Sequence, residues 1–217
     1  MGIKRFHKFY AVLLVSVIVF CMAGLSFAAP PENFTATMVM QGMTMPMAKM
    51  GNKMRMENPM MQGMITISLM DSRKMIMMST INKKYMEQTM KDDAPSIYDP
   101  KAVFEKKKIG SETVDGHPCI KYDTMFYLRD KPAEKYRATI WEAQDLGGLP
   151  IRNEMIVPPD KRHGGPEKVV SELKDIRTGA AKSSMFEVPA GYKKAGSMQE
   201  VMGMGGMMNQ MDRMKQR

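Results

Sequence analysis

A mainly β protein of the α+β class is the fold that the sequence predicts: an open, curved antiparallel β-sheet or unclosed barrel of about ten or eleven strands. From Phe34 to Arg177, short runs alternate between apolar and polar residues, which is the period of a half-buried strand. Gly, Pro, Asn and Asp separate these runs, as turns between neighbouring antiparallel strands require. We therefore expect a meander of hairpins.

The first 28 residues have the features of a cleavable export signal. Three basic residues near the start precede an almost unbroken apolar run from Tyr10 to Leu25, and small residues stand at Ser26 and Ala28. The run is shorter than the roughly 20 residues that a membrane-spanning helix needs. We predict cleavage after Ala28 and a periplasmic protein. Lipid attachment at Cys21 is disfavoured, because the bulky Phe20 precedes it.

The chain after the signal divides into one domain, residues 29–194, and a methionine-rich tail, residues 195–217. In the tail, Ser197 followed three residues later by Glu200 predicts a helix start. The sequence "GMGG" then makes a continuous helix unfavourable. We expect this tail to be flexible or partly helical.

Charge and cysteine content restrict the partners and the means of stabilisation. The formal net charge is +9, and basic and acidic residues are interspersed. This predicts a mildly basic surface that could make transient contact with an acidic membrane; it does not indicate nucleic acid. Cys119 is the single cysteine outside the signal, so no intramolecular disulfide is expected. Its position in "HPCIKY" indicates a buried, inert strand residue.

Several motifs, in order, resemble a family of exported bacterial domains of uncharacterised function, which is similar to the LolA and LolB lipoprotein carriers. They are "KMGNKMRMEN", "ISLMDSRKMIMM", "NKKYMEQTM", "VDGHPCIKY", "ATIWEAQDLGGLPIRNEM" and "ELKDIRTGAAKSSMFEVPAGYKK". The resemblance extends from Asn33 to Lys194. It implies an unclosed barrel with a short helical lid over an apolar cavity, which in the named carriers accepts the acyl chains of a lipoprotein. A lipid, an acyl chain or a lipidated protein is the partner that it implies.

Apolar residues at alternate strand positions are the ones that we expect to line such a cavity. They are Phe34, Met38, Met40, Met54, Met56, Ile65, Ile67, Leu69, Met75, Met77 and Trp141.

The 29 methionines leave a second hypothesis open, a periplasmic buffer or sensor for Cu(I) or Ag(I). Thioether sulfur is a soft ligand that selects such ions. Strands also need apolar residues at alternate positions, and methionine fills them with an adaptable side chain. The sequence favours lining over metal binding. The metal-binding candidates are Met43, Met45 and Met47, where Pro46 is expected to disturb the strand, and in the tail Met204, Met207, Met208 and Met211.

Catalytic motifs are absent from the sequence. It contains no G-x-S-x-G, H-E-x-x-H, P-loop or dinucleotide fingerprint. Outside the signal its histidines are His117, in a turn, and His163, in a loop. We therefore predict a non-enzymatic binding protein with no catalytic residues and no cofactor.

Overall fold

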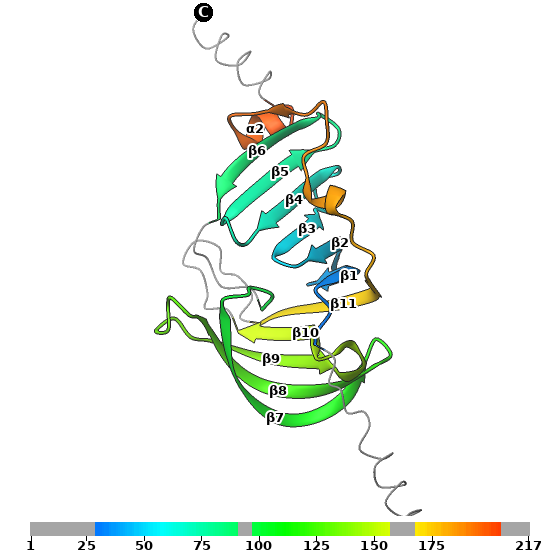
Figure 1. The fold of residues 1–217 in the computed structure, drawn as a ribbon, viewed down its shortest axis with the longest axis vertical. Helices are drawn as coiled ribbons and strands as arrows, with labels where there is room; N and C mark the ends of the chain where they lie inside the picture. The colour runs from blue at the N-terminus through cyan, green and yellow to red at the C-terminus, as the bar shows by residue number, and fades with distance from the viewer. Residues whose placement is uncertain (1–28, 91–96, 157–167, 205–217) are drawn as a thin grey trace, which may run out of the picture.

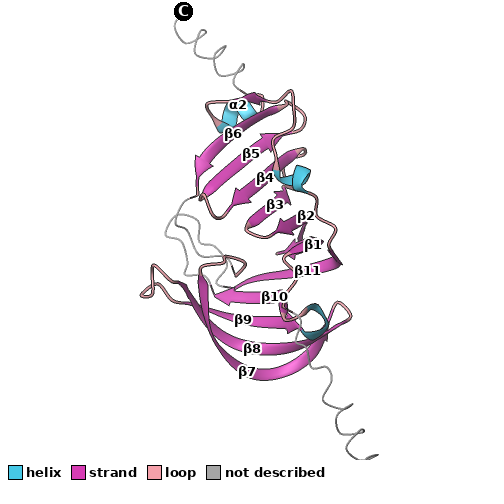
Figure 2. Ribbon diagram, in the orientation of Figure 1, coloured by secondary structure: helices cyan, strands magenta, loops and turns pink. Residues whose placement is uncertain are grey.

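One sheet, antiparallel except for its two-residue edge strand, organises the part of the chain that the computed structural model describes, residues 29–90, 97–156 and 168–204. In these ranges it holds twelve strands and three helical segments of three or four residues (Figure 2). The strands are β1 Asn33–Met40, β2 Met43–Met50, β3 Lys53–Glu57, β4 Met64–Leu69, β5 Lys74–Ser79, β6 Lys84–Thr89, β7 Ala102–Val114, β8 His117–Leu128, β9 Tyr136–Ala143, β10 Leu149–Ile156, β11 Lys168–Thr178 and β12 Lys193–Lys194. The helices are η1 Gln144–Leu146, η2 Ser183–Phe186 and α2 Met198–Val201.

The predicted hairpin meander is confirmed. The strand order is β12-β6-β5-β4-β3-β2-β1-β11-β10-β9-β8-β7, so two runs of consecutive hairpins are joined where β1 pairs with β11. The two edges, β7 and β12, lie at opposite ends of this order, and the sheet is open (Figure 1). The prediction of ten or eleven strands missed one, the two-residue β12, which pairs parallel with β6. No helix in the described ranges is long and apolar enough to cross a membrane.

The sheet has an inner face, which we define by Ile140 and the residues that share its side. Strands β7–β10 curve, and the segment before β7 lies on the side toward which they curve (Figure 1). Ile97 and Tyr98 of that segment pack against Phe126, Ala138 and Ile140. The inner face of β8 and β9 is therefore closed by the chain itself.

The side of the sheet opposite to the inner face is called the outer face. On β2–β6 it is covered by the segment after β11. Ala181 and Phe186 are buried there against Ile67 and Met78. Asn33 holds this segment: its amide donates to the Ala181 carbonyl over 3.0 Å and accepts from the Ala181 amide over 2.9 Å. These two bonds fix residues that are 148 positions apart.

The short helix α2 closes one end of the inner face. Its cap is the predicted one, because the Ser197 hydroxyl accepts a hydrogen bond from the Glu200 amide over 3.3 Å. Val201 is fully buried and packs with Met64 of β4 and Met86 of β6. A short helical element thus lies over part of the inner face, as the fold prediction expected.

Candidate functional site

Methionines gather on one face of β1–β6. Residues that lie directly opposite each other in antiparallel strands point to the same side. Register connects Met40 to Ser171, Ser171 to Asn153 and Asn153 to Ile140, so Met40 lies on the inner face. Of the thirteen methionines in β1–β6, register places all but Met50 and Met78 on this face. These inner methionines are Met38, Met40, Met43, Met45, Met47, Met54, Met56, Met64, Met75, Met77 and Met86.

Five residues form a continuous line across five strands, which we call the thioether row. Met47 of β2 lies opposite Met56 of β3, Met56 opposite Thr66 of β4, Thr66 opposite Met77 of β5, and Met77 opposite Met86 of β6. Neighbouring strands are about 4.8 Å apart, so the row is about 19 Å long. Four of its five side chains are thioethers.

The inner methionines are partly accessible. Met38, Met45, Met47, Met54 and Met64 are buried. The remaining six are half-buried: Met40, Met43, Met56, Met75, Met77 and Met86. A half-buried apolar side chain still has surface to remove from water, so this face retains a driving force for binding an apolar chain.

Beside the thioether row, a second line on the same face carries polar groups. Lys49 lies opposite Met54, Met54 opposite Ser68, Ser68 opposite Met75, and Met75 opposite Gln88. The Gln88 amide donates to the Met75 sulfur over 3.5 Å. This inner face therefore presents an apolar line with polar groups alongside it.

Lys49 is the cation in the polar line. Its ammonium donates to the Gly51 carbonyl over 2.8 Å. Burial lowers the pKa of Lys49, and the nearby Glu32 carboxylate opposes that change.

The predicted lining residues divide between the two faces. Phe34 and the predicted methionines share the inner face. Ile65, Ile67 and Leu69 are corrected to the outer face, because Ile67 lies opposite Arg55 and Ile76 while Ile65 lies opposite Met78. A strand with apolar residues on both sides does not reveal which side is which; pairing with β3, where Arg55 lies opposite Ile67 and Met56 opposite Thr66, decides it.

By register Trp141 lies on the outer side of β9, since it follows Ile140 and lies opposite Lys121 and Arg152, while it belongs to the same buried hydrophobic cluster as Phe34, Met38 and Met54. Only 2% of it is exposed. The Lys121 ammonium lies 4.6 Å and the Arg152 guanidinium 4.9 Å from its ring centroid. Its indole N–H donates to Glu112. These contacts make Trp141 part of a charged and aromatic cluster on β7–β10.

The candidate metal ligands are only partly brought together. Met43, Met45 and Met47 share the inner face, but Pro46 does not disturb β2, which runs through it. Pairing of β2 with β3 ends at Met47, so Pro46 lies where a strand tolerates proline. Met204 follows α2, and Met207, Met208 and Met211 lie outside the described residues. Within the described ranges, no group of three His, Cys, Asp or Glu could hold a metal ion.

A cysteine, a histidine and a carboxylate lie close together at the start of β8. His117 Nδ1 lies 2.7 Å from Asp145 Oδ2, and the Cys119 thiol donates to the His117 carbonyl over 3.4 Å. Burial raises the pKa of Cys119 to about 11, so the thiol stays protonated near neutral pH. The buried cysteine agrees with the sequence prediction, and this group lacks an activated nucleophile.

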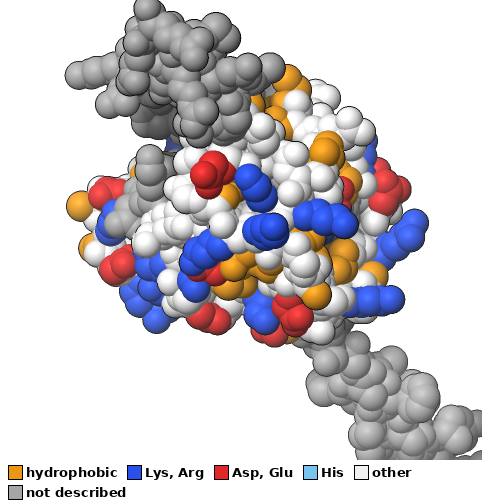
Figure 3. Space-filling model, turned by 90° about the horizontal axis from the view of Figure 1, so that it is seen from above, with side chains coloured by type: hydrophobic (Ala, Val, Ile, Leu, Met, Phe, Trp, Pro, Cys, Tyr) orange, Lys and Arg blue, Asp and Glu red, His pale blue; other side chains and the backbone are white. Residues whose placement is uncertain are grey.

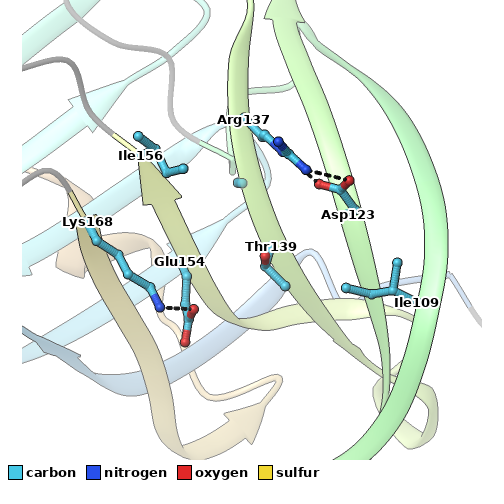
Figure 4. A pocket seen from close by; sticks show the side chains of 8 residues that line it. Ile109, Asp123, Arg137, Thr139, Glu154, Ile156 and Lys168 are labelled. Atoms are coloured by element: carbon cyan, nitrogen blue, oxygen red, sulfur yellow. Dashed lines mark hydrogen bonds and ion pairs between the residues drawn. The ribbon is translucent and has the colours of Figure 1, made fainter.

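An outer pocket of about 370 Å³ lies over β7–β11 (Figure 4). Two ion pairs cross it: Arg137 binds Asp123 through two hydrogen bonds of 3.1 and 3.0 Å, and Lys168 lies 2.5 Å from Glu154. Arg137 lowers the pKa of Asp123, and Lys168 is the main cause of the lowered pKa of Glu154. Both carboxylates therefore stay ionised near neutral pH and are poor proton donors. A second outer pocket, also about 370 Å³, includes Arg55 and Arg177.

Comparison with known proteins found no matching family model and no matching curated protein. Solved structures that are similar to this chain include an uncharacterised conserved protein from Thermus thermophilus, with a TM-score of 0.46, 9% identity and coverage of 76% of this chain and 90% of that one. A DUF1329 family protein from Desulfovibrio piger has a TM-score of 0.37 and 14% identity, with 72% and 90% covered. A LolA superfamily protein from Nitrosomonas europaea has a TM-score of 0.32 and 9% identity, with 75% and 91% covered.

Proposed function

We propose that this chain is a periplasmic, non-enzymatic carrier or binding protein that holds a lipid, an acyl chain or the lipid anchor of a protein against its methionine-rich inner face. The single observation that carries the proposal is the division of methionines between the faces. Eleven of the thirteen methionines in β1–β6 share the inner side, while the outer side uses Ile65, Ile67, Leu69 and Ile76 under the covering segment. Methionine that only replaced other core residues would be expected on both faces.

Thioether side chains suit a surface that must adapt to its ligand. Methionine is unbranched and polarizable, and it repacks around varied apolar shapes where Ile or Leu would hold one shape. The outer face, whose partner is a fixed part of the chain, carries branched residues at Ile67 and Ile76. The inner face has the composition expected of a surface that binds its ligand reversibly.

The thioether row has the dimensions of an acyl chain. The hydrocarbon core of a bilayer is about 30 Å thick, so a chain that fills one leaflet extends over about 15 Å. The row is about 19 Å long. An acyl chain laid along it would contact Met47, Met56, Met77 and Met86, and Lys49 in the adjacent line would lie near one end of the row for an anionic headgroup.

Measurement of acyl-probe binding to the chain without residues 1–28 tests the proposal. The double variant Met56→Gln/Met77→Gln places two amides in the row and should weaken binding by about tenfold, because two apolar contacts are replaced by groups that lose water on binding. The matched control, Met50→Gln/Leu69→Gln, alters two half-buried outer residues that lie in line through Lys53.

The control should bind the probe within about twofold of the wild-type value. Equal losses in the two double variants would contradict the assignment to the inner face. Lipid extraction from the protein purified from the periplasm supplies a second readout, and a chain that never carries lipid would contradict carriage itself.

A further inference from the structure

Four of the six large hydrophobic residues that are most exposed in the described ranges lie at one end of the molecule. Met60 is 77% exposed and Met61 40%, in the turn between β3 and β4. Ile81, in the turn between β5 and β6, is 64% exposed, and Met204, after α2, is 45% exposed. Figure 3 views the molecule from above, where hydrophobic side chains lie among Lys and Arg side chains.

Contacts between the turns hold these residues together. The Thr80 amide donates to the Gly63 carbonyl over 2.8 Å. Gly63 has φ +75°, and a Cβ there would lie 3.0 Å from Ile81 Cγ1, so the two turns are packed side by side. The Asn82 amide donates to the Val201 carbonyl over 3.0 Å, which joins α2 to the same turn.

Two pairs of lysines, 110 positions apart in the sequence, meet beside these turns. The Lys193 amide donates to the Lys83 carbonyl over 2.9 Å, and the β12–β6 pairing sets Lys193 opposite Lys84 and Lys194 opposite Tyr85. Lys194 pairs with Glu87 at 2.9 Å. Among the described residues, no carboxylate lies within ion-pair distance of Lys83, Lys84 or Lys193.

We propose that this end docks on an anionic lipid bilayer, with the exposed turn residues entering the headgroup region and the lysines contacting lipid phosphates. We call these residues the docking end: Met60, Met61, Ile81, Met204, Lys83, Lys84, Lys193 and Lys194. Apolar tips flanked by lysines match the two attractions of such a surface, burial of apolar side chains and electrostatic attraction. Lysine is depleted from protein interfaces, and aromatic residues and arginine are enriched there, so the composition favours lipid over a protein partner.

The docking-end residues that the variants change lie outside the thioether row, so the two proposals fail separately. Vesicle sedimentation of the chain without residues 1–28 tests the docking end, with vesicles of phosphatidylglycerol and phosphatidylethanolamine compared with phosphatidylcholine vesicles. The wild type should bind the anionic vesicles and lose binding between about 0.01 M and about 1 M salt, where the Debye length falls from about 30 Å to about 3 Å.

Two variants separate charge from insertion. Lys83→Gln/Lys193→Gln should lower partitioning onto the anionic vesicles about fivefold for each lysine removed, at low salt. Met60→Ser/Met61→Ser/Ile81→Ser should lower partitioning at least about tenfold at low salt although it keeps every lysine, since it removes apolar burial.

Matched controls come from the same protein. Lys106→Gln/Lys107→Gln removes two lysines on the β7 edge, and Ile109→Ser/Ile156→Ser removes two exposed isoleucines beside the outer pocket. Both controls should stay within about twofold of the wild type. The proposal would be overturned by any of three results. The wild type does not bind anionic vesicles, the docking-end variants bind as well as the wild type, or the control variants lose as much binding as the docking-end variants. Acyl-probe binding should be unchanged in all four variants.

Discussion

Met47 and Met56 lie directly opposite each other on β2 and β3, and the line that they begin continues across the inner face to Met77 and Met86. Cβ atoms of directly opposed residues in antiparallel strands are about 4.5–5.5 Å apart, so side chains of this row can touch one ligand together. The row is a consequence of register, because each hairpin turn in β2–β6 brings alternate residues to the same side.

The position of a bound acyl chain can be read by fluorescence, because Trp141 is the single tryptophan and lies on the outer face. A brominated acyl chain quenches tryptophan on contact, so it should leave Trp141 emission nearly unchanged. The double variant Trp141→Phe/Met77→Trp moves the reporter into the thioether row. Its emission should fall strongly on titration with the same chain. Quenching of Trp141 in the wild type, with none in the variant, would place the ligand on the other face.

The lining hypothesis and the metal-binding hypothesis predict different effects when methionine is replaced by leucine. Met43→Leu/Met45→Leu/Met47→Leu keeps the apolar character of three inner positions and removes their sulfurs. If these residues act as lining, acyl-probe binding should change by less than about threefold, and competition assays should give the same Cu(I) affinity as the wild type. A loss of Cu(I) affinity with retained folding would instead assign these thioethers to a soft-metal site.

Asn33 provides a test of the segment that covers the outer face. Asn33→Ala removes both hydrogen bonds to Ala181, and Ala181 is only 5% exposed, so its amide and carbonyl would be left without this partner. We expect a loss of about 2 kcal/mol in the free energy of unfolding, measured by urea denaturation. The control Asn52→Ala removes one exposed bond, 2.7 Å long, to Asp71, and should cost less than about 1 kcal/mol. A larger loss in the control would contradict the role given to Asn33.

Lys49 gives a pH dependence with a definite sign. Burial lowers its pKa in the folded chain, so the folded state binds fewer protons than the unfolded state between the two pKa values. The destabilisation that burial of the Lys49 ammonium causes is complete at pH values below the folded pKa. It disappears as the pH rises toward the unfolded pKa of about 10.4. Unfolding of the wild type and Lys49→Met should be compared at neutral pH and through the alkaline range. The free energy of unfolding of the wild type should rise relative to that of Lys49→Met as the pH rises. A difference between the two that stays constant with pH would contradict the burial of a charged Lys49.

Some elements could be predicted from sequence because they depend on local patterns. Alternation of apolar and polar residues predicted the hairpins, and Ser197 with Glu200 predicted the start of α2, since both patterns involve residues a few positions apart. Burial of Cys119 followed from its position in an apolar strand. The exposed lysines of β7, an edge strand, follow the general rule for protecting an edge.

The face on which a residue lies could not be predicted where both sides of a strand are apolar. Ile67 and Met77 were expected to line one cavity, yet Ile67 lies on the outer face and Met77 on the inner one. A register shift of one residue exchanges the two faces of a strand, and register depends on the turns and on the partner strand. Register places Ile140 and Trp141 on opposite sides of β9, and both are apolar and buried, so the sequence pattern did not show which of them lies on which side.

The sequence by itself determined the mainly β class, the hairpin order and the wealth of thioether side chains, because period, turn residues and composition are properties of short segments. Only the tertiary structure decided that eleven methionines share one face, that residues 181–186 cover the opposite face, and that Lys83 and Lys193 meet at one end. Each of these depends on pairing between distant segments. That pairing is selected by the combined burial and hydrogen bonding of the whole sheet, which no local pattern contains.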